Sequence, residues 1–285
     1  MFLRSAPKHA RGAAYERTAE PVISDYERAR SLVPALDPDA LYLSRLSARS
    51  ALYTDLRLLL NGLREALPSS SYRSLILDEN RLSRASAAAR GKIWKELKTR
   101  YTLDRDAPLF RAFWVEWRRC ESEQERALIT YVLLALNDRL VSDLGMQWLF
   151  PLLRRAPAEL RVEEVLSFVR RASSLHQEVR RWSDETRLAV AQKYLASLRD
   201  FGLAQGKVKK ATVRPALYAA PARLLIRALR LAGVRELELV QAPIFRLIGF
   251  DGLEIIDALS ELHRREELRF KIQADIVEIG LETGR

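Results

Sequence analysis

The chain has 285 residues, of which 48% are hydrophobic and 30% are charged, and its formal net charge is +11. That balance is typical of a folded protein, and the single cysteine, Cys120, excludes an internal disulfide and a zinc site built from the cysteines of one chain. The longest uncharged stretch, residues 127–137, is shorter than a membrane span, and residues 1–17 lack the apolar core of a secretory signal, so we expect a cytoplasmic protein.

The positive charge is concentrated in two parts of the chain. Residues 41–120 carry a net charge of +8 and residues 201–230 carry +7, whereas residues 1–40 and 121–200 are neutral. Residues 231–285 are negative, with a net charge of −4. Two basic blocks favour a polyanionic partner, because each phosphate that a cation neutralises releases condensed counterions.

Helical periodicity dominates residues 41–220. Residues 1–40 lack it, contain four prolines, and predict an extended or disordered arm. Residues 41–220 predict a helical domain with helix-turn-helix-like segments. Its first element is one amphipathic helix from Leu43 to Leu67, which Pro68 stops. The next predicted helices are Ser71–Asp78, a longer helix that ends at Tyr101, one through Phe110–Trp117, then Glu123–Leu140 and Asp143–Arg155.

A set of three helices follows, over Val162–Arg171, Leu175–Arg181 and Asp184–Phe201. Ser183 is the expected N-cap of the third helix, and Gly202 is expected to end it.

Residues 221–285 predict a C-terminal winged-helix-like module, since their elements follow the order helix, strand, helix, helix and hairpin. These elements are Ala222–Leu231, a strand over Glu236–Val240, Ile244–Ile248, Leu253–His263 and a hairpin within Leu268–Gly280. The helix over residues 253–263 carries three carboxylates, which would repel the phosphates of DNA. We therefore expect this module to serve as a scaffold or a protein-contact surface rather than to bind DNA. The predicted fold class is mainly α: a multi-helix protein with helix-turn-helix-like elements and short β-hairpin wings.

The first candidate site is the basic segment that ends at Tyr101. Its cations are Arg81, Arg84, Arg90, Lys92, Lys95, Lys98 and Arg100, against one acid, Glu96. A helical wheel places Ala89, Ile93, Leu97 and Tyr101 on one face, and Arg84, Ala88, Gly91, Lys95 and Lys98 on the opposite face. Small residues flanked by cations let a helix approach a phosphate backbone closely. The alternative is an ordinary solvated helix face.

The second candidate site combines the helix over residues 184–201 with the segment that follows it. This segment contains Lys207, Lys209, Lys210 and Arg214 without a nearby acid. A hairpin turned by Gly206 would form a wing that grips phosphates, and a flexible basic loop is the alternative. On the helix we expect Thr186, Arg187, Lys193 and Ser197 to face outward. The basic faces offer few Asn or Gln side chains, so contacts are expected mainly with phosphates rather than with bases.

Motifs for catalysis are missing from the sequence. There is no P-loop, no dinucleotide fingerprint and no HExxH, and the three histidines lie far apart. Cys120 beside Arg119 is either a thiol of lowered pKa or, as is commoner, a partly buried cysteine. We therefore expect a protein without catalytic activity, cofactor or metal, although one sequence leaves a site built from distant carboxylates open.

Several segments resemble the BrxA family, whose members are encoded in BREX bacteriophage-exclusion loci. They are Asp78-Glu79-Asn80-Arg81-Leu82 with Ser83 and Ser86, Leu97-Lys98-Thr99-Arg100-Tyr101, Trp182 followed by Thr186, and the run from Tyr194 to Leu203. The resemblance extends from about Tyr42 to about Leu281. It implies a helical protein with helix-turn-helix-like elements that binds double-stranded DNA and serves phage defence beside a methyltransferase and other BREX components, without enzymatic activity of its own.

Three hypotheses about the function follow from these features. The first is a DNA-binding accessory protein of phage defence. The second is an RNA-binding protein that uses the same cations. The third is an assembly subunit whose basic faces and C-terminal module contact other proteins of a defence complex. A nuclease is the least favoured hypothesis, because no acidic metal-binding cluster is evident near the basic blocks.

Overall fold

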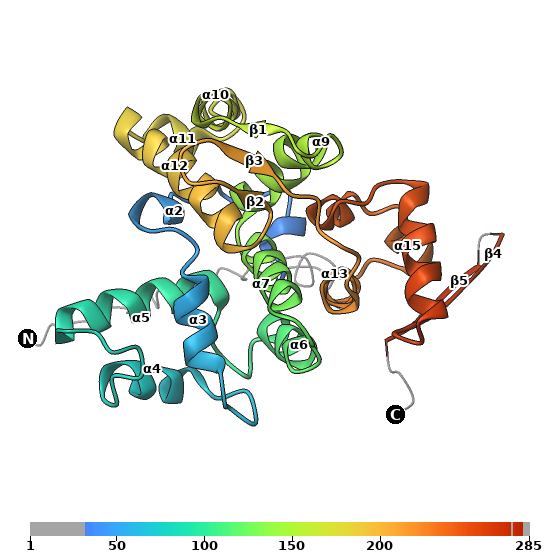
Figure 1. Cartoon of the computed structure of the whole chain (residues 1–285), viewed down its shortest axis with the longest axis horizontal. Helices are drawn as coiled ribbons and strands as arrows, with labels where there is room; N and C mark the ends of the chain where they lie inside the picture. Colours follow the sequence, from blue (N-terminus) through green and yellow to red (C-terminus); the bar gives the residue numbers. More distant parts are fainter. Residues whose placement is uncertain (1–31, 275, 282–285) are drawn as a thin grey trace, which may run out of the picture.

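The structure is a computed structural model that describes residues 32–274 and 276–281. The described chain is mainly helical, with a few short antiparallel strands in two small sheets, so the predicted fold class is confirmed. Figure 1 shows the helix α7 (Glu123–Asn137) in the middle of the molecule, with α3–α5 towards one end and α15, β4 and β5 at the other. Among the described helices, none is long and apolar enough to cross a membrane.

The N-terminal elements differ from the single helix predicted over residues 43–67. The structure has the short helix α2 (Arg45–Ala48) and then α3 (Tyr53–Leu60), and Leu52 between them adopts a left-handed conformation with φ of 59°. The cause is a contact across the fold. The buried Arg100 guanidinium donates to the carbonyl oxygens of Arg45 (2.8 Å) and Arg49 (2.9 Å) and also to that of Ser50, so the backbone turns around this cation.

The following helices match their predictions more closely. They are α4 (Ser69–Leu77), α5 (Ala87–Tyr101) and α6 (Pro108–Trp117). The aromatic face predicted for residues 110–117 is core, since Phe110 and Phe113 are buried with ring centroids 5.8 Å apart. Helix α7 is buried along most of its length and supports the elements on both sides of it. Hydrophobic periodicity was therefore a reliable guide for this part of the chain.

Residues 139–153 form one continuous helical run rather than the separate helix predicted from Asp143. The run consists of α8 (Arg139–Asp143), the π-helix η2 (Leu144–Leu149) and α9 (Phe150–Leu153). Gly145 lies within the π-helical turn, where a Cβ atom would collide with the Tyr131 hydroxyl and with Leu247. A glycine thus permits η2 to pack closely on the core.

Helices α10 (Val162–Ala172), α11 (Gln177–Arg180) and α12 (Asp184–Asp200) form the predicted three-helix set. A three-stranded antiparallel sheet accompanies them, in the order β1 (Glu159–Leu160), β3 (Lys210–Thr212) and β2 (Ala204–Gln205). Strand β3 is in the middle, pairing Glu159 with Ala211 on one side and Ala204 with Thr212 on the other. The strand before α10 and the hairpin after α12 therefore close into one sheet beside the helices.

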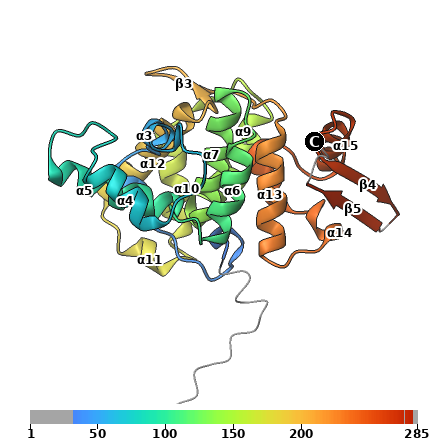
Figure 2. The ribbon, with the colours of Figure 1, turned by 90° about the horizontal axis from the view of Figure 1, so that it is seen from below.

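The C-terminal region begins with α13 (Ala219–Leu231), which packs beside α6 and α7 (Figure 2). Then come α14 (Glu236–Leu239), the 3-10 helix η3 (Pro243–Ile248), α15 (Leu253–Arg264) and the hairpin of β4 (Arg269–Gln273) and β5 (Ile276–Gly280).

The strand predicted over residues 236–240 is wrong, because these residues form the helical turn α14. The Glu238 carboxylate accepts a hydrogen bond from the Arg235 N–H at 3.3 Å, which stabilises a helix start that alternating Glu and Leu alone do not reveal. The C-terminal sheet consequently has two strands, β4 and β5, and a helical turn stands where the predicted order had its first strand.

Most of the arm predicted over residues 1–40 lies outside the described residues. The described part, residues 32–40, contains the 3-10 turn η1 (Pro34–Leu36), which contacts α7 and α8. Val33 and Ala35 are buried there, and Arg139 donates to the carbonyl oxygen of Asp37 at 2.8 Å. These nine residues belong to the folded body.

Candidate nucleic-acid interface

The outward face of α5 carries the first group of exposed cations. Helix α5 begins where the Ser86 hydroxyl accepts the Ala89 N–H at 3.2 Å. Ile93, Leu97 and Tyr101 are buried, as the helical wheel predicted. Lys92, Lys95 and Lys98 are exposed on the other side, and the space beyond Gly91 is open. The side of α5 that faces solvent is therefore basic and has little bulk at its centre.

Three arginines of the same segment are used within the fold. Arg84 precedes α5 instead of lying on it, and its guanidinium pairs with the Asp55 carboxylate. Arg81 donates to the carbonyl oxygens of Asn61 and Leu58, and Arg100 is buried. The predicted position of Arg84 on the outward face of the helix is wrong, and carbonyl or carboxylate groups distant in sequence bind all three arginines. Arg90 is partly buried on α5.

Helix α12 has the predicted boundaries. The Ser183 hydroxyl accepts the Thr186 N–H at 3.2 Å, and Gly202 follows the helix with φ of 74°. Its orientation was predicted correctly for Lys193, which is exposed. Ser197 is buried, because its hydroxyl accepts the Ala51 N–H at 2.9 Å, so its predicted outward position is wrong.

Arg187 also turns away from the outward position that was predicted for it. Arg187 donates to the Asp184 carboxylate at 3.0 Å and to the carbonyl oxygens of Val179 and Arg180. Its side chain is only 18% exposed, so it stabilises the approach of α11 to α12. Thr186 is half-buried at the helix start.

The solvent-facing side of α12 consists of Lys193 and of residues that were not predicted to lie there. Leu188, Gln192, Lys193 and Arg199 are exposed along it, and Ala189 and Ala196 lie partly exposed between them. Sequence reasoning missed Gln192 and Arg199. A signal was present: Val190, Ala191, Tyr194 and Leu198 define an apolar face, and a wheel centred on them places Gln192 and Arg199 opposite.

The hairpin predicted around Gly206 is present, so the flexible-loop alternative is ruled out for its strands. Strands β2 and β3 pair, and Gly206 adopts φ of 94° between them. Lys207 and Lys209 are exposed at the tip, and Lys210 is half-buried, with its Nζ donating to the Lys207 carbonyl oxygen at 3.3 Å. Arg214 is exposed just after β3.

These side chains share one electrostatic property. Within the described residues, none of them forms an ion pair with a carboxylate: Lys92, Lys95, Lys98, Lys193, Lys207, Lys209, Lys210 and Arg214. The acidic helix α15 differs, since its Glu261 pairs with both Arg264 and Arg265. Exposed cations without an internal ion pair remain available for an external polyanion.

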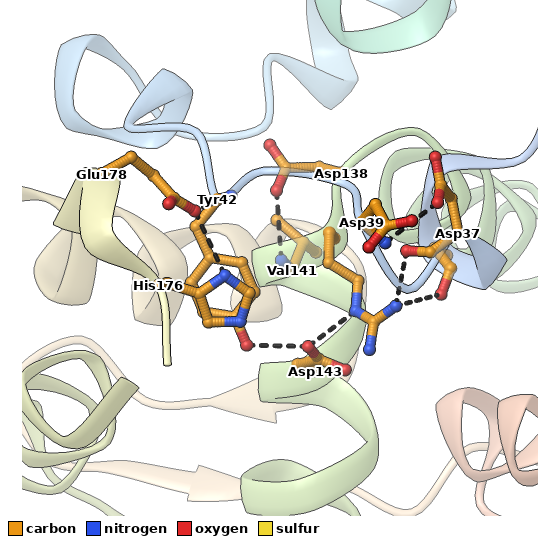
Figure 3. Close-up of polar contacts among 10 residues, drawn as sticks. Asp37, Asp39, Tyr42, Asp138, Val141, Asp143, His176 and Glu178 are labelled. Atoms are coloured by element: carbon orange, nitrogen blue, oxygen red, sulfur yellow. Dashed lines mark hydrogen bonds and ion pairs between the residues drawn. The ribbon is translucent and has the colours of Figure 1, made fainter. Parts of the chain in front are cut away.

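A separate polar cluster around Tyr42 lies between the N-terminal segment, α8 and α11 (Figure 3). The Tyr42 hydroxyl donates to Asp143 at 2.7 Å, and Arg139 donates to the same carboxylate oxygen at 2.8 Å. The ring stacks on His176 with 3.6 Å between centroids, and the Tyr42 N–H donates to Glu178 at 2.7 Å. Burial and Asp143 raise the pKa of Tyr42, so the hydroxyl stays a proton donor and the cluster holds these elements together.

Two further features bear on possible chemistry, Cys120 and the grouping of metal-binding side chains. Cys120 is buried with its thiol donating to the Glu116 carbonyl oxygen at 3.4 Å, and burial raises its pKa, so it is the commoner buried cysteine. Within the described part of the chain, no group of three or more His, Cys, Asp or Glu side chains has the proximity to hold a metal ion.

Comparison with known proteins gives one family. The model of the BrxA family matches residues 40–228, which contain α2–α12, both strands of the basic hairpin and most of α13. No curated protein matches the chain.

Proposed function

Because the chain belongs to the BrxA family, we propose that it is an accessory protein without catalytic activity that binds double-stranded DNA in a bacterial phage-exclusion system. The family itself associates the chain with BREX phage defence. Binding to DNA, the absence of catalysis and contacts with other BREX components are the parts that we propose.

One observation supports DNA binding most directly. Exposed cations are clustered on α5 and on the β2–β3 hairpin, and within the described residues none of them is paired with a carboxylate. Keeping several like charges together on a surface costs free energy unless a partner of opposite sign binds there. A duplex offers a regular row of phosphates, and side chains such as Lys95, Lys98, Lys207 and Lys209 are suited to contact it.

The arrangement around α12 gives further support. A winged helix is expected to have three helices followed by a β-hairpin. Helices α10, α11 and α12 have this order, and the β2–β3 hairpin follows them, with β3 also pairing with β1. We infer that α12 enters a groove and that the hairpin is the wing whose lysines contact the backbone. We propose that residues 159–212 act as a winged-helix-like unit, which includes the wing that the sequence analysis expected around Gly206.

A salt titration tests this proposal. Binding of the full chain to duplex DNA, single strands and structured RNA is measured by fluorescence anisotropy at several salt concentrations. We expect the affinity for duplex DNA to fall steeply as the salt concentration rises. The Lys95→Glu/Lys98→Glu variant should reduce the magnitude of the slope of log K against log salt by about two, because about one counterion is released for each phosphate contact. The loss is expected for all duplex sequences alike.

A charge-matched variant controls for the change in net charge. Arg269→Glu/Lys271→Glu introduces the same change on the exposed strand β4, and its affinity should stay close to that of the unmodified chain. Equal losses in both variants would show that total charge, not the α5 face, determines affinity. A preference for structured RNA over the duplex would favour the RNA-binding hypothesis over DNA binding. The absence of any salt-dependent binding would refute both hypotheses.

A further inference from the structure

The exposed face of α12 differs in chemistry from the other basic surfaces. The α5 face presents lysines around small residues, whereas α12 presents Gln192 and the 40% exposed Leu188 together with Lys193 and Arg199. At 100° per residue, Leu188, Gln192 and Arg199 fall within a narrow stripe. A surface that binds phosphates needs neither an amide nor an apolar side chain. Phosphate contact therefore does not explain why Gln192 and Leu188 are exposed on this stripe.

Gln192 has the functional groups that an adenine edge requires. Its amide offers an acceptor oxygen and two N–H donors. In the major groove an adenine presents the N7 acceptor beside the N6 amino donor, and a glutamine matches both at once. Leu188, one turn before Gln192, gives an apolar surface for a thymine methyl group, and the small Ala189 and Ala196 permit close approach to the base edges.

The charges on α12 favour insertion of its middle rather than of its ends. Asp184 and Glu185 lie in the first turn and Asp200 at the last position, so the stretch around Gln192 contains no acid. Lys193 is adjacent to Gln192 and exposed, so it is free to contact a phosphate or a guanine edge, whereas Arg199, two turns further on, pairs with Asp200 at 3.6 Å.

The fold holds α12 in a fixed position. It packs against α10 and α2, and the Ser197 hydroxyl is bound by the Ala51 N–H at 2.9 Å. The hairpin with Lys207 and Lys209 begins two residues after Gly202 ends the helix. A rigid helix next to a phosphate-binding wing is the arrangement in which side chains on the helix obtain a defined register against base pairs.

From these observations we infer that the protein reads sequence through α12, with Gln192 contacting an adenine in the major groove of an A·T-containing site. The inference rests on the proposed binding to duplex DNA. It changes the expectation from the sequence that DNA is contacted mainly through phosphates. The sequence predicted Thr186, Arg187, Lys193 and Ser197 as outward residues of this helix, whereas the fold also exposes Gln192.

Selection from a randomised duplex library tests the inference. The full chain is expected to enrich a site with a fixed adenine, and Gln192→Ala is expected to reduce the preference for that adenine about 5- to 150-fold, the range of one bidentate contact. Gln192→Ala should keep its affinity for unrelated duplexes, since the amide makes no phosphate contact in this arrangement. Gln241→Ala, which removes an exposed glutamine from the C-terminal region, is the matched control and should leave the selected site unchanged.

A base analogue isolates the contact without relying on the variant alone. Replacing the selected adenine by 7-deazaadenine removes the N7 acceptor, and this should weaken binding of the unmodified chain but not of Gln192→Ala, as in a double-mutant cycle. Equal weakening in both proteins would overturn the assignment to Gln192. Salt-dependent binding without any enriched site would refute the inference and leave the proposed function intact, whereas no duplex binding at all would refute both.

Discussion

Replacing Asp138 by asparagine should stabilise the protein at neutral pH and have a smaller effect at acidic pH. Asp138 is 3% exposed and is the N-cap of α8, where its carboxylate accepts the Val141 N–H at 3.3 Å (Figure 3). Burial raises its pKa from 3.8 to about 6, although Arg45 and Arg100 partly oppose the shift. The fold therefore binds the proton of this carboxyl group more tightly than the unfolded chain does.

The sign of the pH dependence follows from this difference. A carboxyl group whose pKa is raised in the folded state contributes stability that is fully present below the unfolded value of 3.8 and is lost as the pH rises through about 6. A difference of about two pKa units corresponds to about 3 kcal/mol in the free energy of unfolding. Asparagine keeps the cap and has no charge to bury. The stability of Asp138→Asn relative to the unmodified chain should thus rise by about 2.5 kcal/mol between pH 4 and pH 7.5, because a small part of the difference is already present at pH 4.

Urea unfolding at a series of pH values, followed by tryptophan fluorescence, measures that difference. Asp78→Asn provides the control, because it removes one carboxylate from an exposed position at the end of α4. Comparing two proteins at each pH cancels the titration of all other groups. A difference in unfolding free energy between Asp138→Asn and the unmodified chain that stays constant from pH 4 to pH 7.5 would refute the reasoning.

Two further outcomes are expected from single contacts. Glu116 is fully buried and accepts hydrogen bonds from Arg223 (2.6 Å) and Arg227 (2.8 Å). Glu116→Ala leaves these cations without their partner, so urea denaturation should show a free energy of unfolding lowered by about 3–5 kcal/mol. A loss no larger than that of a surface ion pair would contradict this expectation. Gly206 has φ of 94°, and a Cβ atom there would collide with the Lys209 carbonyl oxygen. Gly206→Ala should therefore distort the hairpin and weaken duplex binding in the anisotropy assay, with the melting temperature as the check that the rest of the fold is intact.

Features that depend on neighbouring residues were predictable from the sequence. The start of α12 at Ser183 and its end at Gly202 follow from local hydrogen bonding and backbone preference, and both were predicted correctly. The apolar face of α5 was predicted because helical periodicity alone determines which side chains share a face. The hairpin was predicted as one of two alternatives, since a glycine between basic residues also suits a loop.

Features that depend on distant residues were not predictable. The break between α2 and α3 is caused by Arg100, which the sequence suggested as a surface cation. The orientation of α12 depends on Ala51, which binds Ser197 from another part of the chain and so sets which side faces solvent. In both cases a polar group that is unremarkable in sequence meets a backbone group across the fold, and only the folded chain shows the pairing.

The segment from Tyr42 to Ala51 connects both basic surfaces. On one side, Arg100 of α5 donates to three carbonyl oxygens within this segment. On the other side, Ala51 binds α12, and Tyr42 is joined to the residues around α11. The lysine face of α5 and the glutamine face of α12 are therefore fixed to the same short stretch of backbone. A duplex that contacts both faces would meet a rigid surface, so the ordering cost of placing these side chains is met largely during folding rather than on binding.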